Sequence, residues 1–154
     1  MRHLFYFLSS TFCIGLLFVT ACNDPADRSN PTLENAPKPA PMVCVAYVLA
    51  QDDSLGAIRN HACETISLAE TIRNYTDGLE HINYNGCPAE FKEAFKAHWE
   101  AWRQMIPLVE KYPNLRGEMH DLFDVLEEGE HADEFKPLLQ AIWDTWGEVE
   151  KAKK

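Results

Sequence analysis

Apolar side chains recur at steps of three and four residues through most of the chain after residue 54, as they do along one face of an α-helix. The longest such pattern predicts one helix over 54–82. Three further patterns predict helices from Pro88 to about Met105, from Asn114 to Gly129, and from Asp133 to about Glu150. Proline suits the first turn of a helix, asparagine and aspartate suit the N-cap, and glycine suits the residue after the end.

These four predicted helices are joined by short connections, which make neighbouring helices antiparallel. We therefore expect an all-α domain over 43–154, formed by an antiparallel four-helix bundle. The segment at about 43–51 precedes the first predicted helix and is expected to pack on the bundle as an extra N-terminal segment. One such domain is long enough to have its own hydrophobic core.

The stretch 22–42 has a different composition, with few apolar side chains and prolines at five positions, 25, 31, 37, 39 and 41. Such a segment cannot bury enough apolar surface to fold, and proline favours the extended polyproline II conformation at about 3.1 Å per residue. We interpret it as a flexible tether that spans up to about 60 Å.

Residues 1–21 have the pattern of a secretory signal peptide, with Arg2 before an apolar run and small residues at its end. Val19-Thr20-Ala21-Cys22 resembles the lipobox of bacterial lipoproteins. That resemblance implies cleavage before Cys22, attachment of a diacylglycerol to its sulfur and acylation of the new amino terminus. An uncleaved transmembrane anchor or an ordinary secretory signal is the alternative, although the run is shorter than a spanning helix needs and is interrupted by serines.

The resemblance also implies a location in the bacterial cell envelope. Asn23 follows the cysteine, whereas in enterobacterial lipoproteins an aspartate at that place favours the inner membrane. By this resemblance, the expected location is the periplasmic face of the outer membrane rather than the inner membrane.

Acidic residues outnumber basic ones, and the chain has a formal net charge of −10. This charge argues against a nucleic-acid partner. Acids are concentrated over 118–134, where no lysine or arginine occurs. A basic protein partner is one interpretation of this acidic stretch, and a solvated helix face is the plainer one. A calcium site is less favoured because the regular EF-hand spacing is absent.

Residues 90–102 and 134–146 are related in sequence, because both contain Glu-Phe-Lys followed at matching positions by an alanine and two tryptophans. The relation suggests two helical hairpins packed with approximate two-fold symmetry. The tryptophans either fill the core or form the walls of a pocket for an apolar or cationic ligand. The residues of this candidate pocket are His98, Trp99, Trp102, Trp143 and Trp146.

His98 takes the place that Ile142 has in the second copy and lies on the apolar face of its predicted helix. A buried imidazole needs hydrogen-bond partners, for which Tyr84, Tyr112 and Glu118 are candidates. A core histidine, a ligand or metal site, and a catalytic base are the three interpretations. No nucleophile that would need a base is evident in the sequence.

Three cysteines, at 44, 63 and 87, lie in the predicted domain. If the chain turned at Asp52-Asp53-Ser54, Cys44 and Cys63 would face each other and form a disulfide, leaving Cys87 as a free thiol. Three buried thiols are the alternative.

No motif for enzymatic chemistry is evident: the sequence has no carboxylate dyad, phosphate-binding loop or covalent haem motif, and it does not predict a metal site or a cofactor. We therefore expect a membrane-anchored, non-enzymatic envelope lipoprotein with a protein-interaction role. The alternative is a periplasmic carrier or sensor that binds a small ligand or metal at His98 and the tryptophan repeat.

Overall fold

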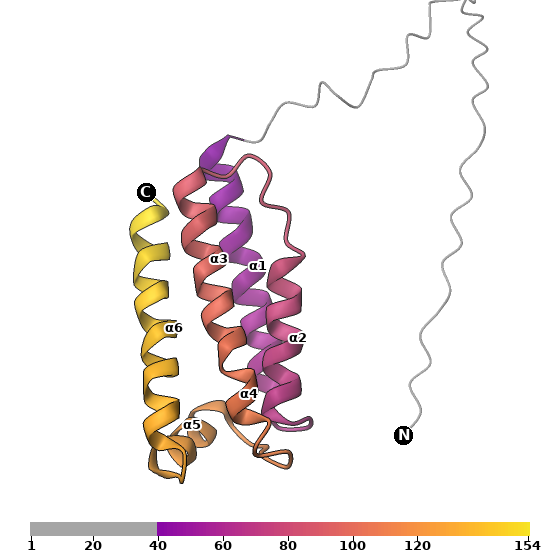
Figure 1. Ribbon diagram of the computed structural model, residues 1–154. Helices are drawn as coiled ribbons and strands as arrows, with labels where there is room; N and C mark the ends of the chain where they lie inside the picture. Colours follow the sequence, from indigo (N-terminus) through magenta and orange to yellow (C-terminus); the bar gives the residue numbers. More distant parts are fainter. Residues whose placement is uncertain (1–39) are drawn as a thin grey trace, which may run out of the picture. The chain divides into compact units, whose positions relative to one another are not determined.

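The computed structural model describes residues 40–154, which form helices and no strands (Figure 1). The helices are α1 (Pro41–Ala62), α2 (Leu68–Glu80), α3 (Ala89–Gln104), α4 (Ile106–Val109), α5 (Met119–Glu128) and α6 (Ala132–Ala152). The prediction of an all-α domain is confirmed. None of these helices has the length and apolar character required to cross a bilayer. The predicted signal peptide, Cys22 and nearly all of the tether lie outside the described residues.

The first long helix was predicted at the wrong place. α1 begins at Pro41, so the segment at about 43–51 is its N-terminal half rather than an extra segment, and Asp52-Asp53-Ser54 lies inside it. The expected helix over 54–82 is broken at 63–67, where the chain reverses direction. Ser67 begins α2, because its side-chain oxygen accepts a hydrogen bond from the backbone N–H of Glu70 at 3.3 Å.

Four of the helices are long and pack in the order α1, α2, α3, α6. Along this order each helix runs opposite to the one before it (Figure 1). The predicted third helix, over 114–129, is represented by the shorter α5, which lies at one end of the long helices and packs on α6. The four long helices are therefore not the four that the sequence patterns predicted.

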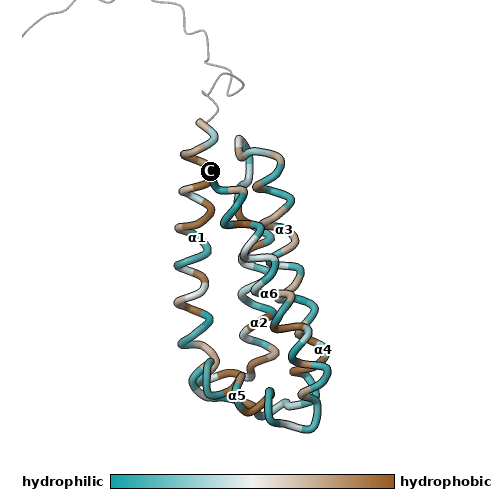
Figure 2. Tube along the Cα trace, turned by 90° about the vertical axis from the view of Figure 1, so that its left-hand side faces the viewer, coloured by the Kyte–Doolittle hydropathy of each residue, from teal (hydrophilic) through white to brown (hydrophobic). Residues whose placement is uncertain are grey.

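The core lies between these helices and is rich in aromatic side chains. Phe91 and Phe95 of α3 and Phe135 of α6 are fully buried, as expected for the apolar faces of the two related segments. Hydrophobic and hydrophilic residues alternate along α1 (Figure 2). Several of its large apolar side chains are exposed, namely Met42, Val43, Tyr47 and Ile58.

The disulfide also differs from the predicted one. Cys44 is bonded to Cys87, with their Cα atoms 5.1 Å apart, and Cys63 is a buried free thiol. The physical reason is the reversal at 63–67: α2 returns alongside α1, so the segment after α2 ends near the start of α1. Cys63 lies at the opposite end, where its thiol donates to the carbonyl of Asn60 at 3.0 Å.

Candidate functional site

The five residues of the predicted pocket lie in two different places. His98 and Trp102 of α3 and Trp143 and Trp146 of α6 line one cavity, which also contains Ile142. Trp99 lies on another face of α3 and lines a separate cavity between α2 and α3. The repeat-related tryptophans therefore have unlike surroundings: Trp99 is 7% exposed, whereas Trp143 is 62% exposed.

The first cavity is part of a groove between α1 and α6, which we call the α1–α6 groove. It consists of two adjoining cavities of about 150 and 100 Å³ that share Arg59, Trp102, Ile142 and Trp143. The other lining residues of the groove are Asp52, Tyr75, His98 and Trp146 on one side, and Asn60, Met119, His120, Phe123 and Leu139 on the other.

His98 is 4% exposed at the base of this groove, and both of its ring nitrogens have partners. The indole N–H of Trp102 donates to Nε2 at 3.3 Å, and Nδ1 lies 3.2 Å from the hydroxyl of Thr145 on α6. That hydroxyl donates to the backbone carbonyl of Ala141 at 2.7 Å, so Nδ1 is the nitrogen that carries the proton. The partners are therefore Trp102 and Thr145, and not Tyr84, Tyr112 or Glu118.

Burial lowers the pKa of His98 to about 4. The imidazole is therefore neutral near pH 7, which agrees with its role as acceptor from Trp102. A neutral imidazole with two engaged nitrogens has no free lone pair for a metal and no free proton for a ligand. The geometry at His98 is that of a satisfied core histidine.

Arg59 of α1 is the residue of the groove that the sequence analysis missed. Its guanidinium carbon lies 4.4 Å from the ring centroid of Tyr75 and 4.3 Å from the ring of Trp102, so it contacts an aromatic side chain from α2 and another from α3. These are cation–π distances. The two rings meet edge to face with centroids 5.5 Å apart.

A buried carboxyl, that of Asp52, lies two helical turns before Arg59 on the same face of α1. Asp52 accepts a hydrogen bond from the Tyr75 hydroxyl at 2.6 Å. Burial raises the pKa of Asp52, and it also raises the pKa of Tyr75. Asp52 forms no ion pair with Arg59 among the described residues, although the charge of Arg59 acts against the rise in the pKa of Asp52. The close contacts of the guanidinium are the rings of Tyr75 and Trp102.

A usable sequence signal for these residues exists once α1 is placed correctly. Val45, Val48, Asp52 and Arg59 follow helical spacing on the buried side of α1. Charged residues in register with buried valines indicate a polar site beneath the helix. Because we expected a turn at 52–54, these residues were not recognised as one face of a single helix.

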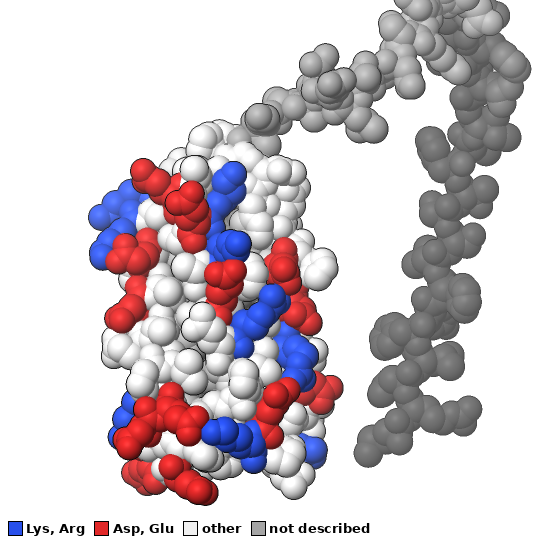
Figure 3. Space-filling view, in the orientation of Figure 1, with Lys and Arg blue, Asp and Glu red and all other residues white. Residues whose placement is uncertain are grey.

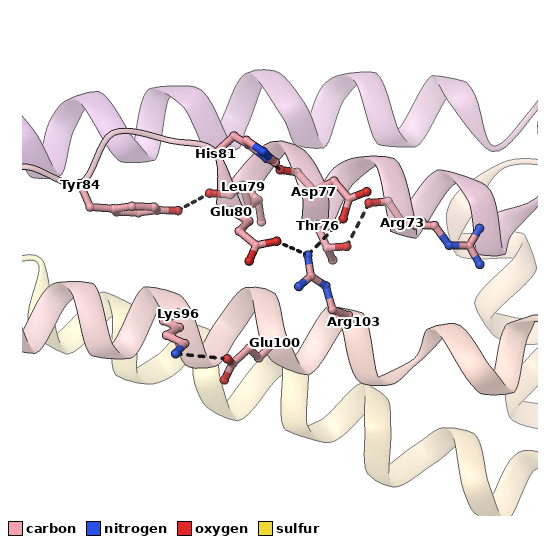
Figure 4. Close-up of polar contacts among 10 residues, drawn as sticks. All are labelled: Arg73, Thr76, Asp77, Leu79, Glu80, His81, Tyr84, Lys96, Glu100 and Arg103. Carbon is pink, nitrogen blue, oxygen red and sulfur yellow. Dashed lines mark hydrogen bonds and ion pairs between the residues drawn. The ribbon is translucent and has the colours of Figure 1, made fainter.

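The cavity between α2 and α3 is the larger one, at about 490 Å³, but most of its charges are paired within the protein. Arg103 lies over the ring of Trp99 at 4.7 Å and donates to Asp77 at 3.1 Å and to Glu80 at 2.9 Å. Figure 4 shows the contacts of Arg103 with Asp77 and Glu80 and the ion pair between Lys96 and Glu100. An anionic ligand would have to compete with these carboxylates, so we interpret the cavity as part of the α2–α3 packing.

The acidic stretch over 118–134 covers α5 and the start of α6, and Asp and Glu atoms gather at that end of the molecule (Figure 3). Two of its acids have local structural roles. Glu118 accepts from the backbone N–H groups of His120 and Asp121 at the start of α5, and Glu134 pairs with Lys111 and His131. A basic partner for the remaining acids stays a prediction.

Within residues 40–154, no group of three or more histidine, cysteine or acidic side chains has a geometry that could hold a metal ion. Comparison with known proteins found no matching family model, no similar curated protein and no similar solved structure. The functional argument therefore rests on the geometry of this chain.

Proposed function

We propose that the protein is a membrane-anchored lipoprotein of the bacterial cell envelope that binds a partner protein through the α1–α6 groove and catalyses no reaction. Lipidation at Cys22 and a location at the outer membrane follow from the resemblance of residues 19–22 to a lipobox. The tether would let the domain reach partners up to about 60 Å from its lipid anchor.

The observation that carries the binding role is the exposed indole of Trp143 beside Arg59. Tryptophan, tyrosine and arginine supply most of the binding energy in protein interfaces. Here they occur together on a hollowed surface, with Trp143 62% exposed and Arg59 partly buried. A large exposed indole next to a groove contributes little to folding, and binding is a physical reason for its exposure.

The alternative function, a carrier or sensor of a small ligand or metal at His98, has less support. The cavity beside His98 has about 150 Å³, whereas small-molecule sites typically have about 300–1,000 Å³. Both ring nitrogens of His98 are already engaged within the protein. A shallow groove that holds one or two side chains of a partner fits these dimensions better.

Substitution of Trp143 tests this proposal. We expect Trp143→Ala in the full chain to abolish co-purification of the partner from detergent-solubilised envelopes. The thermal unfolding temperature should barely change, because exposed substitutions usually alter stability by less than about 0.5 kcal/mol. Val125→Ala is the matched control, since Val125 is an exposed apolar residue on α5 within the acidic stretch. If Val125→Ala, but not Trp143→Ala, abolished co-purification of the partner, the binding surface would lie in the acidic stretch. That result would contradict the proposal.

A further inference from the structure

Arg59 differs from the other described arginines in having a partly buried charge without a carboxylate partner. Arg73 pairs with Glu110, and Arg103 pairs with Asp77 and Glu80. Arg116 is exposed to solvent. Arg59 forms no ion pair within residues 40–154, although burial makes a counter-charge worth more than it is at the surface.

The guanidinium of Arg59 is nevertheless held in a defined position. Its Nε and Nη2 atoms donate to the side-chain oxygen of Asn60 at 3.2 and 3.1 Å, and the rings of Tyr75 and Trp102 contact it. A guanidinium has five N–H groups, and the bonds to Asn60 use two of them. The two rings are nearly perpendicular, at 82°, so the guanidinium lies face to face with at most one of them. The three N–H groups that do not bond to Asn60 are those that could bind a carboxylate.

Among the described residues, the acid that lines the groove is Asp52, which lies close enough for the charge of Arg59 to act against the rise in its pKa but forms no ion pair with Arg59. Asp52 accepts from the Tyr75 hydroxyl and is buried, at 8% exposure. His120 lines the second cavity, and its Nδ1 lies 2.8 Å from a carboxylate oxygen of Glu118. Glu118 itself does not line the groove. The charge of Arg59 is therefore available to an anion that enters from solvent.

The position of Arg59 in the groove indicates what kind of molecule would supply such an anion. Arg59 belongs to both cavities of the groove, and each cavity continues away from it in its own direction. The first cavity extends from Arg59 along α1 to Asp52, and the second extends from Arg59 to Met119 and His120 at the start of α5. A bound segment that occupies both cavities would pass Arg59, so its carboxylate would come from a side chain rather than from a chain end.

We propose that the α1–α6 groove recognises a short segment of a partner protein in which an aspartate or glutamate lies between apolar side chains. Arg59 pairs with the carboxylate, and Trp143 and Trp146 contact the flanking apolar groups. This inference rests on the proposed protein-binding function and specifies the chemistry of the partner.

The test uses a photoreactive aromatic residue, benzoylphenylalanine, at position 139 of the full chain in living cells, because Leu139 lines the groove and its replacement leaves Trp143 in place. We expect a covalent adduct with one partner, which Arg59→Gln reduces at least tenfold and Arg59→Lys reduces less. Arg116→Gln is the matched control, because it removes an exposed arginine without touching the groove. Circular dichroism of each purified variant establishes that it is folded.

The cross-linked segment, identified by mass spectrometry, then serves as a synthetic peptide. We expect exchange of its acidic residue for the amide to weaken binding to the full chain in detergent at least tenfold, with no further loss when Arg59→Gln is also present. Such non-additivity shows that the two groups interact directly. An adduct that survives Arg59→Gln, or a peptide that does not need its carboxylate, would overturn this inference alone. No adduct at position 139 would overturn the proposed function as well.

Discussion

At the scale of single residues, His98 forms hydrogen bonds with residues of two helices, Trp102 of α3 and Thr145 of α6. Its place on the apolar face was evident from sequence, but its partners were not. Thr145 is on α6, and its contact with His98 depends on the packing of α3 against that helix. The candidates proposed from sequence, Tyr84, Tyr112 and Glu118, are not its partners.

Replacement by the residue of the second copy, His98→Ile, tests the role of this histidine in the core. We expect the free energy of unfolding at pH 7 to fall by about 1–3 kcal/mol, because the buried indole N–H of Trp102 loses its acceptor. Urea unfolding of the two proteins measures the difference. Unchanged stability would mean that the hydrogen bond from Trp102 contributes nothing.

The same variant tests the pH dependence of stability. Burial lowers the pKa of His98 to about 4, below the ordinary histidine value of 6.5, so at lower pH the unfolded chain takes up a proton that the folded chain does not. The contribution of His98 to stability is therefore present above pH 6.5 and is lost as pH falls toward 4. We expect the wild type to lose about 2 kcal/mol more than His98→Ile between pH 7 and pH 5. Equal losses would contradict the buried, neutral imidazole.

The surroundings of Arg59 and Trp143 could not be predicted from the sequence. Arg59 contacts Tyr75 and Trp102, which are distant in sequence, and no local pattern encodes that meeting. Trp99 and Trp143 have equivalent positions in the repeat, yet Arg103 covers the ring of Trp99, whereas Trp143 is exposed to solvent. Trp102, Trp143 and Trp146 line the groove, whereas Trp99 lines the cavity between α2 and α3.

At the scale of elements, helical periodicity was sufficient to predict that the domain is all-α, and it located α3 and α6 well. It failed at 63–67, because apolar spacing continues through the break and joins two helices into one. The sequence does contain a signal for the break: Ser67 followed by Glu70 is the spacing of a capping box. The structure contains one half of that motif, the bond from the backbone of Glu70 to Ser67.

Because this break was missed, the predicted disulfide was wrong. The observed disulfide provides a test of the hairpin that α1 and α2 form. The Cys44–Cys87 bond closes a loop with a sequence separation of 43. We expect Cys44→Ala to lower the free energy of unfolding by about 2–4 kcal/mol, because the unfolded chain regains the freedom of that loop. Chemical denaturation under non-reducing conditions measures the loss.

Thiol labelling provides the complementary measurement. Burial raises the pKa of the Cys63 thiol, so this residue should resist alkylation in the folded protein and react after unfolding. Peptide mapping should assign the label to Cys63 and a linked peptide pair to Cys44 and Cys87. A linked pair that contains Cys63 would contradict the α1–α2 hairpin.

At the scale of the whole molecule, the account joins a membrane anchor to a binding domain. The anchor lies outside the described residues and is inferred from the lipobox resemblance alone. We expect Cys22→Ser to leave an unprocessed precursor that is no longer lipidated, since the sulfur that takes the lipid is missing. Metabolic labelling with a fatty-acid analogue and immunoblotting measure both effects. A variant that is still processed and lipidated would remove the basis for the proposed location.

The central claim, that the α1–α6 groove binds a partner protein, is tested most directly by comparing photo-crosslinking at two positions of α6 in living cells. Position 139 lies in the groove, whereas Glu148 is exposed on another side of the same helix. The account predicts one covalent adduct of defined mass from position 139 and none from position 148. Equal adducts at the two positions, or none at position 139, would contradict it.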